Sequence, residues 1–578
     1  MLNARLYRTA WLVAAVALIV ALLTLQTPLP PPEPVVPASI DGSVVLDGAQ
    51  ELERVAPLRV AGTQDDADAA DWVEQGFTAA LQSTGAASTS RVRRQEFLAR
   101  HRGQLVPMTN VYLSLPGPVS AGGRSGVIVV APRDIGPGIR SSATTTSLLV
   151  ELARLSATSS HDRPLLFVST DGATVGNAGM RWFLAQFAGF KTAAVVVLDG
   201  VGESSDGRTY IWRRGRDGRQ ALAMAHLTQV ALERAGIVVA PAPGASTQLA
   251  LQAVPQSFGD QADAVAAGLP AITISGRPDG PQRSAPLPDA QTMGDIGNAV
   301  MQLLGTLDQV DGVAAPSHAI TLAGRDLSWT MLRIMLLLVA LPVLVAAVDA
   351  FARIRRAGVR LGPGVRSLLW RAGPLLVAVG VMHVAGVAGL LPPAAAGEPP
   401  LPGEVPFTGP GGLALGIALV AGVVTWRLAL HTARRPAAAP AAEAAAGLVA
   451  LAIVCAVAWL ISPFTLLLVL PAAHAVLVAT AAPRRWEVAA LLVLAVLPAV
   501  WVAAAIGSVI DRDPVFSAWY LAATTGEGSR GVSAALVLVA ALACLWSMAV
   551  LVVLRARKGL VAARPPIRRR PRDRRRPR

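Results

Sequence analysis

The chain has 578 residues, of which 53% are hydrophobic and 15% are charged, and its formal net charge is +14 at pH 7. A soluble protein carries about a quarter charged residues, so this composition excludes a chain that is soluble throughout or disordered throughout. Both cysteines, Cys455 and Cys544, fall inside apolar runs. That placement excludes a disulfide framework and a thiolate metal site.

The first apolar run, residues 9–26, has nearly the length of a membrane span and follows Arg5 and Arg8. No small-residue cleavage site is evident after it, so we predict an uncleaved signal anchor over 1–28. Later runs of span length lie at 329–351, 372–392, 411–429, 443–461, 464–482, 487–509 and 532–554. We therefore expect about eight transmembrane helices, seven of them in an all-α membrane domain over 326–556.

The placement of arginine predicts how these spans are oriented, because short loops rich in Lys and Arg stay in the cytoplasm. The linkers after the second, fourth and sixth spans are rich in arginine, whereas the alternate loops are proline-rich or acidic. Residues 555–578 contain twelve Lys or Arg and one acidic residue, Asp573, so this segment supplies 12 − 1 = +11 of the net charge. We expect both termini in the cytoplasm, with the basic tail over 557–578 on anionic lipid and no nucleic-acid partner.

Residues 29–325 then form an extracytoplasmic domain, and its pattern is that of an α/β fold. Runs rich in β-branched residues alternate with longer amphipathic stretches, and the runs lie at 126–131, 164–170, 193–200 and 271–276. This alternation predicts a parallel or mostly parallel sheet covered by helices. Functional residues are expected at the carboxyl ends of the strands.

Seven sequence blocks in this domain, in order and spacing, resemble the motif series of the zinc-dependent aminopeptidase family, which includes bacterial leucyl aminopeptidases and glutamate carboxypeptidases. The blocks are LRVAGTQDDADAADWV (58–73), TNVYLSLPG (109–117), VAPRD (130–134), GPGIRSSATTTSLLVELARL (136–155), LLFVSTDGATVGNAGMRWF (165–183), VVVLDGVG (195–202) and GDQADAVAAGLPAITISG (259–276). The resemblance implies a three-layer α/β/α fold. The layout of one anchor, this domain and a multispan half is also similar to the attachment subunit of the GPI-anchor transamidase.

Members of the aminopeptidase family hold two zinc ions through a bridging carboxylate and use a glutamate as general base. The family's first ligand, a histidine, falls on Pro132, which has no side-chain lone pair. The residue that orients this ligand in the family matches Asp134, and the bridging aspartate falls on Ser141.

The general-base glutamate and the glutamate ligand fall on Ala173 and Thr174, and the final histidine falls on Gln261. Of the five expected metal ligands only Asp199 remains, and a single carboxylate does not make a zinc site. We therefore expect no zinc, no other cofactor and no catalytic residue. Asp134 and Asp199 are then expected to cap turns.

Arg133 and Arg140 fall where the metal cleft would be, so one hypothesis is a pocket that binds a carboxylate or phosphate; the other is two solvated loop arginines. His383 and His474 lie near the middle of apolar runs and are candidates for an intramembrane function. The alternative, a neutral histidine bonded to a neighbouring helix, is favoured because no Asp or Glu lies in the core of any predicted span.

These observations predict a pseudo-peptidase that acts as a binding or scaffold subunit. It would recognise a peptide or lipid-linked substrate at the outer membrane face and present it to a membrane protein partner. Two alternatives stay open. One is a membrane-anchored metallo-aminopeptidase with an altered site, and the other is a transporter whose extracytoplasmic domain captures the substrate.

Overall fold

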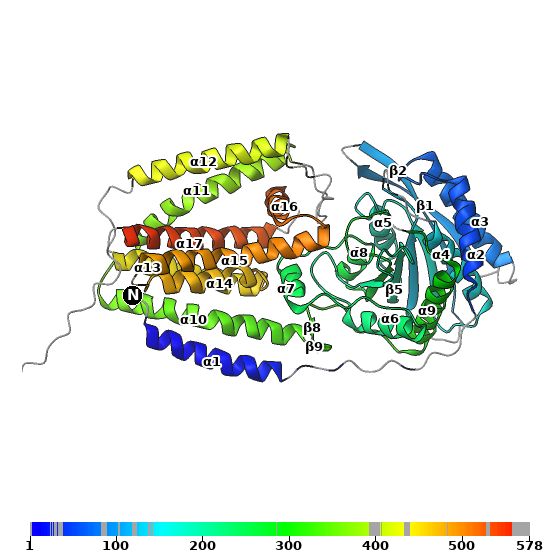
Figure 1. Ribbon diagram of the computed structural model, residues 1–578, viewed down its shortest axis with the longest axis horizontal. Helices are drawn as coiled ribbons and strands as arrows, with labels where there is room; N and C mark the ends of the chain where they lie inside the picture. Colours follow the sequence, from blue (N-terminus) through cyan, green and yellow to red (C-terminus); the bar gives the residue numbers. More distant parts are fainter. Residues whose placement is uncertain are drawn as a thin grey trace, which may run out of the picture.

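The computed structural model of the chain has two parts, an α/β domain and a bundle of long helices that lies end-on beside it (Figure 1). The residues that it describes are 3–23, 25, 27, 32, 39–82, 90–101, 104–117, 124–136, 139, 143–284, 286–391, 405, 407, 409–432, 440–482, 484–527 and 532–557.

A seven-stranded sheet forms the centre of the α/β domain, with the strand order β1-β2-β4-β3-β5-β7-β6. The strands are β1 (Arg91–His101), β2 (Gln104–Leu115), β3 (Gly126–Pro132), β4 (Leu165–Thr170), β5 (Thr192–Asp199), β6 (Tyr210–Trp212) and β7 (Ala271–Ser275). The four central strands, β4, β3, β5 and β7, are parallel to one another, and the flanking strands pair antiparallel. Every residue of β4 and β7 is buried, which is why these strands read as continuous apolar runs.

Helices cover both faces of this sheet, and their bounds are α2 (Gly42–Val55), α3 (Gln64–Gln82), α4 (Thr144–Thr158), α5 (Ala178–Gln186), α6 (Leu222–Arg234), α7 (Ala245–Ala253), α8 (Gln261–Ala266) and α9 (Ala290–Gln309). In Figure 1, α5 and α8 lie between the sheet and the bundle, whereas α3 and α4 lie on the opposite side. The three-layer α/β/α fold and its mostly parallel sheet are therefore confirmed. A small hairpin of β8 (Ile320–Leu322) and β9 (Arg325–Leu327) leads into the bundle.

The bundle contains α1 (Ala4–Leu22), α10 (Trp329–Arg356), α11 (Gly362–Val387), α12 (Pro410–Thr432), α13 (Pro440–Ile461), α14 (Thr465–Ala479), α15 (Arg485–Ile510), α16 (Pro514–Glu527) and α17 (Val532–Arg557). Among the described residues, six of these helices, α10–α13, α15 and α17, are long and apolar enough to cross a membrane. All eight predicted spans correspond to helices, but α1 and α14 are not among these six. Two of the helices, α14 and α11, also differ in length from the predicted spans.

The first difference is α14, which has only 15 residues and is about 22 Å long at the usual rise, less than the ~30 Å of a bilayer core. Pro463 precedes it, and the hydropathy of the predicted run 464–482 continues past its last residue. The second difference is α11, which begins at Gly362, about ten residues before the predicted start, and therefore contains Arg366 and Arg371. Hydropathy alone places its start too late because it stops at the arginines.

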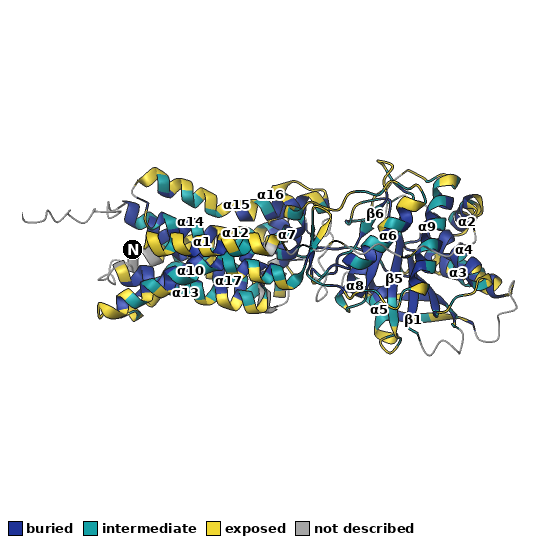
Figure 2. Ribbon diagram, turned by 90° about the horizontal axis from the view of Figure 1, so that it is seen from below, coloured by how far each residue is buried: buried dark blue, intermediate teal, exposed yellow. Residues whose placement is uncertain are grey.

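The outer surface of the bundle is apolar. Figure 2 shows exposed residues along its outer helices, and many are large hydrophobic side chains, among them Val16, Leu419, Val420, Val423, Val496 and Val500. A contiguous apolar surface of this extent on a helical bundle is the surface that faces lipid.

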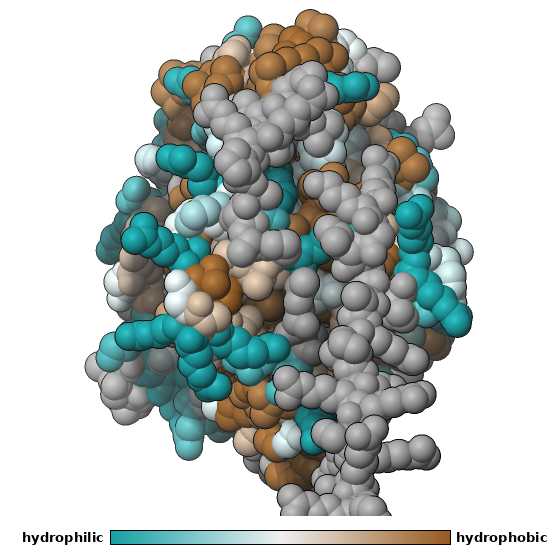
Figure 3. Space-filling model, turned by 90° about the vertical axis from the view of Figure 1, so that its left-hand side faces the viewer, coloured by the Kyte–Doolittle hydropathy of each residue, from teal (hydrophilic) through white to brown (hydrophobic). Residues whose placement is uncertain are grey.

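The end of the bundle away from the α/β domain is rich in hydrophilic side chains (Figure 3). The last turn of α10 contributes Arg353, Arg355 and Arg356 to it, and the first residues of α1 lie at the same end (Figure 1).

The α/β domain is docked on the opposite end of the bundle through α7. Leu251 and Val254 are buried in one cluster with Ile506 and Ile510 of α15 and with Tyr520 of α16. The Tyr520 hydroxyl donates a hydrogen bond to Oε1 of Gln256, with 3.4 Å between the oxygens. Burial of this apolar area holds the two parts in one arrangement.

The loop after β7 makes a second contact at this end. A Cβ on Gly280 would lie 2.8 Å from the carbonyl oxygen of Val509, so only glycine allows the loop to approach α15 this closely. Arg283 pairs with Asp511 at 3.0 Å, but both side chains are largely exposed, so this ion pair adds little.

This docking is testable by hydrogen exchange on the detergent-solubilised chain. We expect Leu251→Asp to increase amide exchange in α7 and in the last turns of α15 together, because a carboxylate is not tolerated in the apolar contact. Val238→Asp is the matched control, since Val238 is 61% exposed, and should leave both segments protected. Unchanged protection of α15 in Leu251→Asp would contradict the docking.

Candidate functional site

The carboxyl ends of β3, β4, β5 and β7 meet at one edge of the sheet, and the resemblance places the metal site there. Asp134, Asp171 and Asp199 follow or end three neighbouring strands. Asp260 lies just before α8 and reaches the end of β4, where its Oδ2 accepts a hydrogen bond of 2.7 Å from the Thr170 hydroxyl. Four carboxyl groups therefore gather at this edge, as expected for a parallel sheet.

Arg133 lies at the centre of the first group of contacts. Its side chain is fully buried, and it forms ion pairs with Asp66 of α3 (Nε to Oδ1, 3.0 Å) and with Asp171 after β4 (Nη2 to Oδ2, 3.1 Å). This corrects the expectation that Arg133 offers its charge to an exogenous anion, because the group is buried and already paired. Arg140, the other arginine of that hypothesis, lies outside the described residues.

Arg59, which lies just before α3, is hydrogen-bonded to the backbone next to these ion pairs. Its Nη1 donates to the carbonyl oxygen of Ala56 at 3.0 Å, and its Nε donates to the carbonyl oxygen of Arg133 at 3.2 Å. The backbone N–H of Ile135 in turn donates to the carbonyl oxygen of Arg59 at 2.7 Å. The block at 58–73 thus fixes the chain just after β3.

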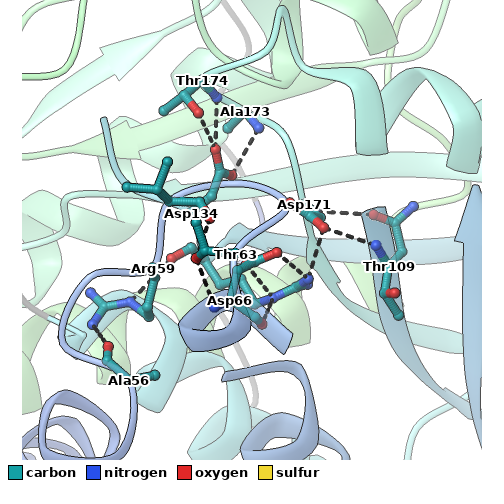
Figure 4. A network of polar contacts seen from close by, with 12 residues as sticks. Ala56, Arg59, Thr63, Asp66, Thr109, Asp134, Asp171, Ala173 and Thr174 are labelled. Atoms are coloured by element: carbon teal, nitrogen blue, oxygen red, sulfur yellow. Dashed lines mark hydrogen bonds and ion pairs between the residues drawn. The ribbon is translucent and has the colours of Figure 1, made fainter. Parts of the chain in front are cut away.

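Asp134 lies beyond Pro132, the last residue of β3, and binds the next loop. Its carboxylate accepts hydrogen bonds of 2.8 Å from the backbone N–H groups of Ala173 and Thr174, and one of 2.6 Å from the Thr174 hydroxyl. Asp134 thus holds the turn that carries Ala173 and Thr174 (Figure 4). The two positions of the family's paired glutamates are in contact with Asp134 through their backbone.

The loop that carries Ala173 and Thr174 is a tight turn. Gly172 has φ +71°, a conformation that an L side chain rarely adopts, and a Cβ there would lie 2.6 Å from Sδ of Met108. Asn177 also has a positive φ, and its side chain donates to Oδ2 of Asp263 at 3.1 Å. The turn is therefore fixed by glycine and asparagine.

Asp199 is the last residue of β5, and its carboxylate forms an ion pair with the guanidinium of Arg277. Nη2 of Arg277 lies 2.7 Å from Oδ2 of Asp199, and both side chains are mostly buried. The same guanidinium donates to the carbonyl oxygens of Gly280 (2.8 Å) and Pro281 (3.1 Å) and lies 4.9 Å from the centre of the Trp212 ring. Asp199 therefore does more than cap a turn: through Arg277 it holds the loop that docks on α15.

Gln261, at the position of the family's final histidine, is completely buried and fully bonded. Its Oε1 accepts from the Thr273 hydroxyl at 2.6 Å, and its Nε2 donates to Oγ of Ser257 at 2.9 Å. A carboxamide can make this donor and acceptor pair at one time, whereas a metal-bound imidazole could not. Gln261 therefore packs as a structural residue.

Burial dominates the electrostatics of this edge. It raises the pKa of Asp260 to about 8, with a minor lowering from the Thr170 hydrogen bond. It raises the pKa of Asp171 to about 7, opposed by the nearby Arg133. Burial also raises the pKa of Asp134, although the bonds from Ala173 and Thr174 lower it.

These residues do not fit the zinc pair that the family resemblance implies. Pro132 and Ala173 have no donor atom, Asp199 is bound to Arg277, and the amide of Gln261 is fully engaged. Within the part of the chain that the structure describes, no group of three or more His, Cys, Asp or Glu side chains is placed to hold a metal ion. Ser141, at the bridging position, lies outside the described residues, and the metal content itself stays a prediction.

The sequence analysis missed Arg277, Asp66 and Asp171. A signal for Arg277 exists, because it comes two residues after β7, the strand that pairs with the end of β5 where Asp199 lies. Asp66 and Asp171 both fall inside the motif blocks, but nothing in the sequence shows that α3 brings one against the other.

Of the two histidines in the bundle, His474 has a structural environment. Its Nε2 lies 3.0 Å from the carbonyl oxygen of Val339, and its Nδ1 lies 2.9 Å from the Tyr7 hydroxyl. A carbonyl only accepts, so Nε2 carries the proton of the neutral ring and the Tyr7 hydroxyl donates to Nδ1. His474 therefore ties α14 to α10 and α1, as the structural alternative predicts. His383 lies on α11, away from this contact.

No protein-family model matches the chain. No curated protein sequence matches it either.

Solved structures with a similar fold each match about half of the chain, at low identity. A glutaminyl cyclase from an Acidobacteriales bacterium is 19% identical over 49% of this chain and 99% of its own, with a TM-score of 0.38. A zinc-dependent exopeptidase from Bacteroides vulgatus is 14% identical over 47% of this chain and 99% of its own, with a TM-score of 0.37. BSAP, a zinc aminopeptidase from Bacillus subtilis, is 11% identical over 46% of this chain and 94% of its own, with a TM-score of 0.35.

The raised pKa of Asp260 predicts a specific pH dependence of stability. Between its ordinary pKa of 3.8 and the folded value of about 8, the folded chain binds the proton more strongly than the unfolded chain. The stabilisation by this proton is complete below the unfolded pKa and is lost as the pH rises toward 8. Relative to Asp260→Asn, which stays neutral, the wild-type chain should lose up to about 1.4 kcal/mol per pH unit.

The measurement is thermal unfolding of both proteins from pH 5 to pH 8 in one detergent. Asp206→Asn is the control, because the pKa of Asp206 is lowered, chiefly by the Tyr210 hydrogen bond, and the group is ionised throughout this range. Parallel pH profiles for the wild-type and Asp260→Asn proteins would show that Asp260 is ionised in the folded state.

Proposed function

We propose that the α/β domain is a binding or scaffold module that does not hydrolyse peptides and that it acts at the outer face of a membrane. The observation that carries the proposal is the Asp199–Arg277 ion pair at 2.7 Å. The one carboxylate kept from the family's ligand set is neutralised by an internal guanidinium. A buried charge that is already paired is a poor site for an added cation, since the pair would have to be broken first.

Two further contacts support this proposal. The Asp134 carboxylate accepts hydrogen bonds from the backbone of Ala173 and Thr174. The Gln261 carboxamide is hydrogen-bonded to Ser257 and Thr273. The positions that would bind metal and activate water thus serve to hold the strand ends together. A fold kept rigid in this way can present a surface for recognition.

The proposed ligand is a peptide or a lipid-linked substrate, and the proposed partner is a second membrane protein. Docking of the domain on the bundle through α7 supports the membrane-proximal location of this ligand, because it holds the α/β domain against the outer end of the helices. The resemblance in layout to the GPI-transamidase attachment subunit supports the same role by analogy alone.

The proposed topology places both termini in the cytoplasm and the α/β domain outside. It is supported by the last turn of α10, which contains Arg353, Arg355 and Arg356 and lies at the end of the bundle away from that domain (Figure 1). The tail at 558–578 lies outside the described residues, and its contact with anionic lipid stays a proposal.

The proposal predicts the metal content of the purified full-length chain. We expect less than one tenth of a zinc ion per chain, by elemental analysis after dialysis against zinc, and no turnover of leucine p-nitroanilide, because too few ligands remain. Asp199→Ala is the matched control for residual metal, since it removes the one retained ligand. Two zinc ions per chain with turnover, both lost in Asp199→Ala, would instead establish the altered metallo-aminopeptidase.

The topology is tested by labelling intact cells with a membrane-impermeant maleimide. Cys455 and Cys544 are both buried and can be replaced by alanine to give a cysteine-free background. Val515, in the first turn of α16, is 80% exposed, and we expect Val515→Cys to react from outside. Arg360→Cys, in the loop between α10 and α11, should react only after the cells are opened. The reverse pattern would invert the topology and place the α/β domain inside.

A further inference from the structure

A groove runs between α14 and α15 in the helical bundle. Its volume is about 530 Å³, within the range of about 300–1,000 Å³ that is usual for ligand sites. Pro471 of α14 and Pro498 of α15 both line it. A proline inside a helix removes one backbone hydrogen bond and bends the helix. Two prolines on facing helices therefore explain why the pair does not close.

The lining of the groove is almost entirely hydrocarbon. Ala475 and Val478 contribute from α14, and Leu494 and Leu497 contribute from α15. Among its lining residues His474 has the one ionisable side chain, and both of its ring nitrogens are already bonded, to Tyr7 and to Val339. Apart from the indole N–H of Trp501 at one end, the side chains that line the groove offer neither a charge nor a free hydrogen-bonding group, so burial of a polar group along its length would be unfavourable.

The groove opens toward the surface that faces lipid. Leu494 and Leu497 are 49% and 50% exposed, and the adjacent Val493 and Val496 are 64% and 57% exposed. A molecule can therefore enter sideways from the bilayer. At its other end the groove reaches Trp501, which packs against the cluster that holds α7 of the α/β domain.

The groove is too small to enclose a partner helix. It follows α15 from Leu491 to Trp501, a length of about 15 Å. A helix of that length and about 10 Å in diameter would fill roughly 1,200 Å³, more than twice the space that is present. A single flexible chain without polar groups fits the space.

We propose that this groove binds one acyl chain of a bilayer glycerophospholipid. The glycerol and head group would then lie toward Trp501, at the end of the groove nearest α7 of the α/β domain. This site goes beyond the scaffold role of the α/β domain and does not depend on it. Dispersion contacts between the acyl chain and the apolar side chains of the groove supply the binding free energy.

The test uses the full-length chain in nanodiscs that contain phosphatidylcholine with a photoreactive diazirine in one acyl chain. After illumination, labelled residues are mapped by mass spectrometry. We expect labelling at Ala475 and Val478 to exceed that at the exposed Val420 and Val423 of α12. Labels in proportion to exposure alone, with Val420 and Val423 above Ala475, would overturn the proposal.

Matched variants separate groove binding from general lipid contact. Leu497→Trp places an indole in the groove and should lower labelling of Ala475 about tenfold, the factor given by losing the burial of about two methylene groups. Val496→Trp, at the neighbouring exposed position outside the groove, should leave it unchanged. An equal effect of both variants would overturn the proposal, and Leu494→Trp with Val493→Trp provides a second pair if Leu497→Trp does not fold.

This experiment contains no peptide, substrate or partner protein. A loss of groove labelling would leave the metal and activity tests of the α/β domain untouched, so the failures of the two proposals are distinguishable.

Discussion

Internal neutralisation of buried carboxylates by arginine is the interaction on which this structure depends. The parallel strands bring Asp134, Asp171 and Asp199 to one edge of the sheet, where desolvation disfavours the charged forms of Asp134 and Asp171. Metal ions compensate such carboxylates in zinc-dependent enzymes. Here Arg133 and Arg277 compensate two of them, at 3.1 Å and 2.7 Å. Removing either guanidinium would leave a buried charge uncompensated, which is far more costly than the pair itself is stabilising.

The same compensation connects the α/β domain to the helical bundle. Arg277 binds Asp199 with one side of its guanidinium and the carbonyl groups of Gly280 and Pro281 with another. Gly280 in turn lies against the backbone of Val509 on α15. The edge of the sheet where Asp134, Asp171 and Asp199 lie is thus the edge that rests on the end of α15. A ligand recognised at this edge and a lipid chain between α14 and α15 would lie on adjoining surfaces of one rigid assembly.

The bundle follows the constraint that backbone polar groups must be satisfied within the helix in lipid. Its polar side chains are paired where they are buried. His474 bonds to two neighbouring helices, and Glu443 of α13 accepts hydrogen bonds of 2.8 Å from Ser367 and Arg371 of α11. Proline is the exception to regular packing, and at Pro471 and Pro498 it opens a groove that is still apolar.

The amino-acid sequence by itself determined the α/β pattern, the mostly parallel sheet, the positions of most apolar helices and the lack of a side-chain donor atom at Pro132 and Ala173. Such features depend on local periodicity and on residue chemistry, which are read along the chain. Tertiary structure alone decided that Arg133 is buried between Asp66 and Asp171, that α14 has only 15 residues, and that α7 docks on α15. These contacts join residues that are far apart in the sequence. Which residues become partners is decided by packing and burial in the folded chain, and a local sequence pattern does not encode packing or burial.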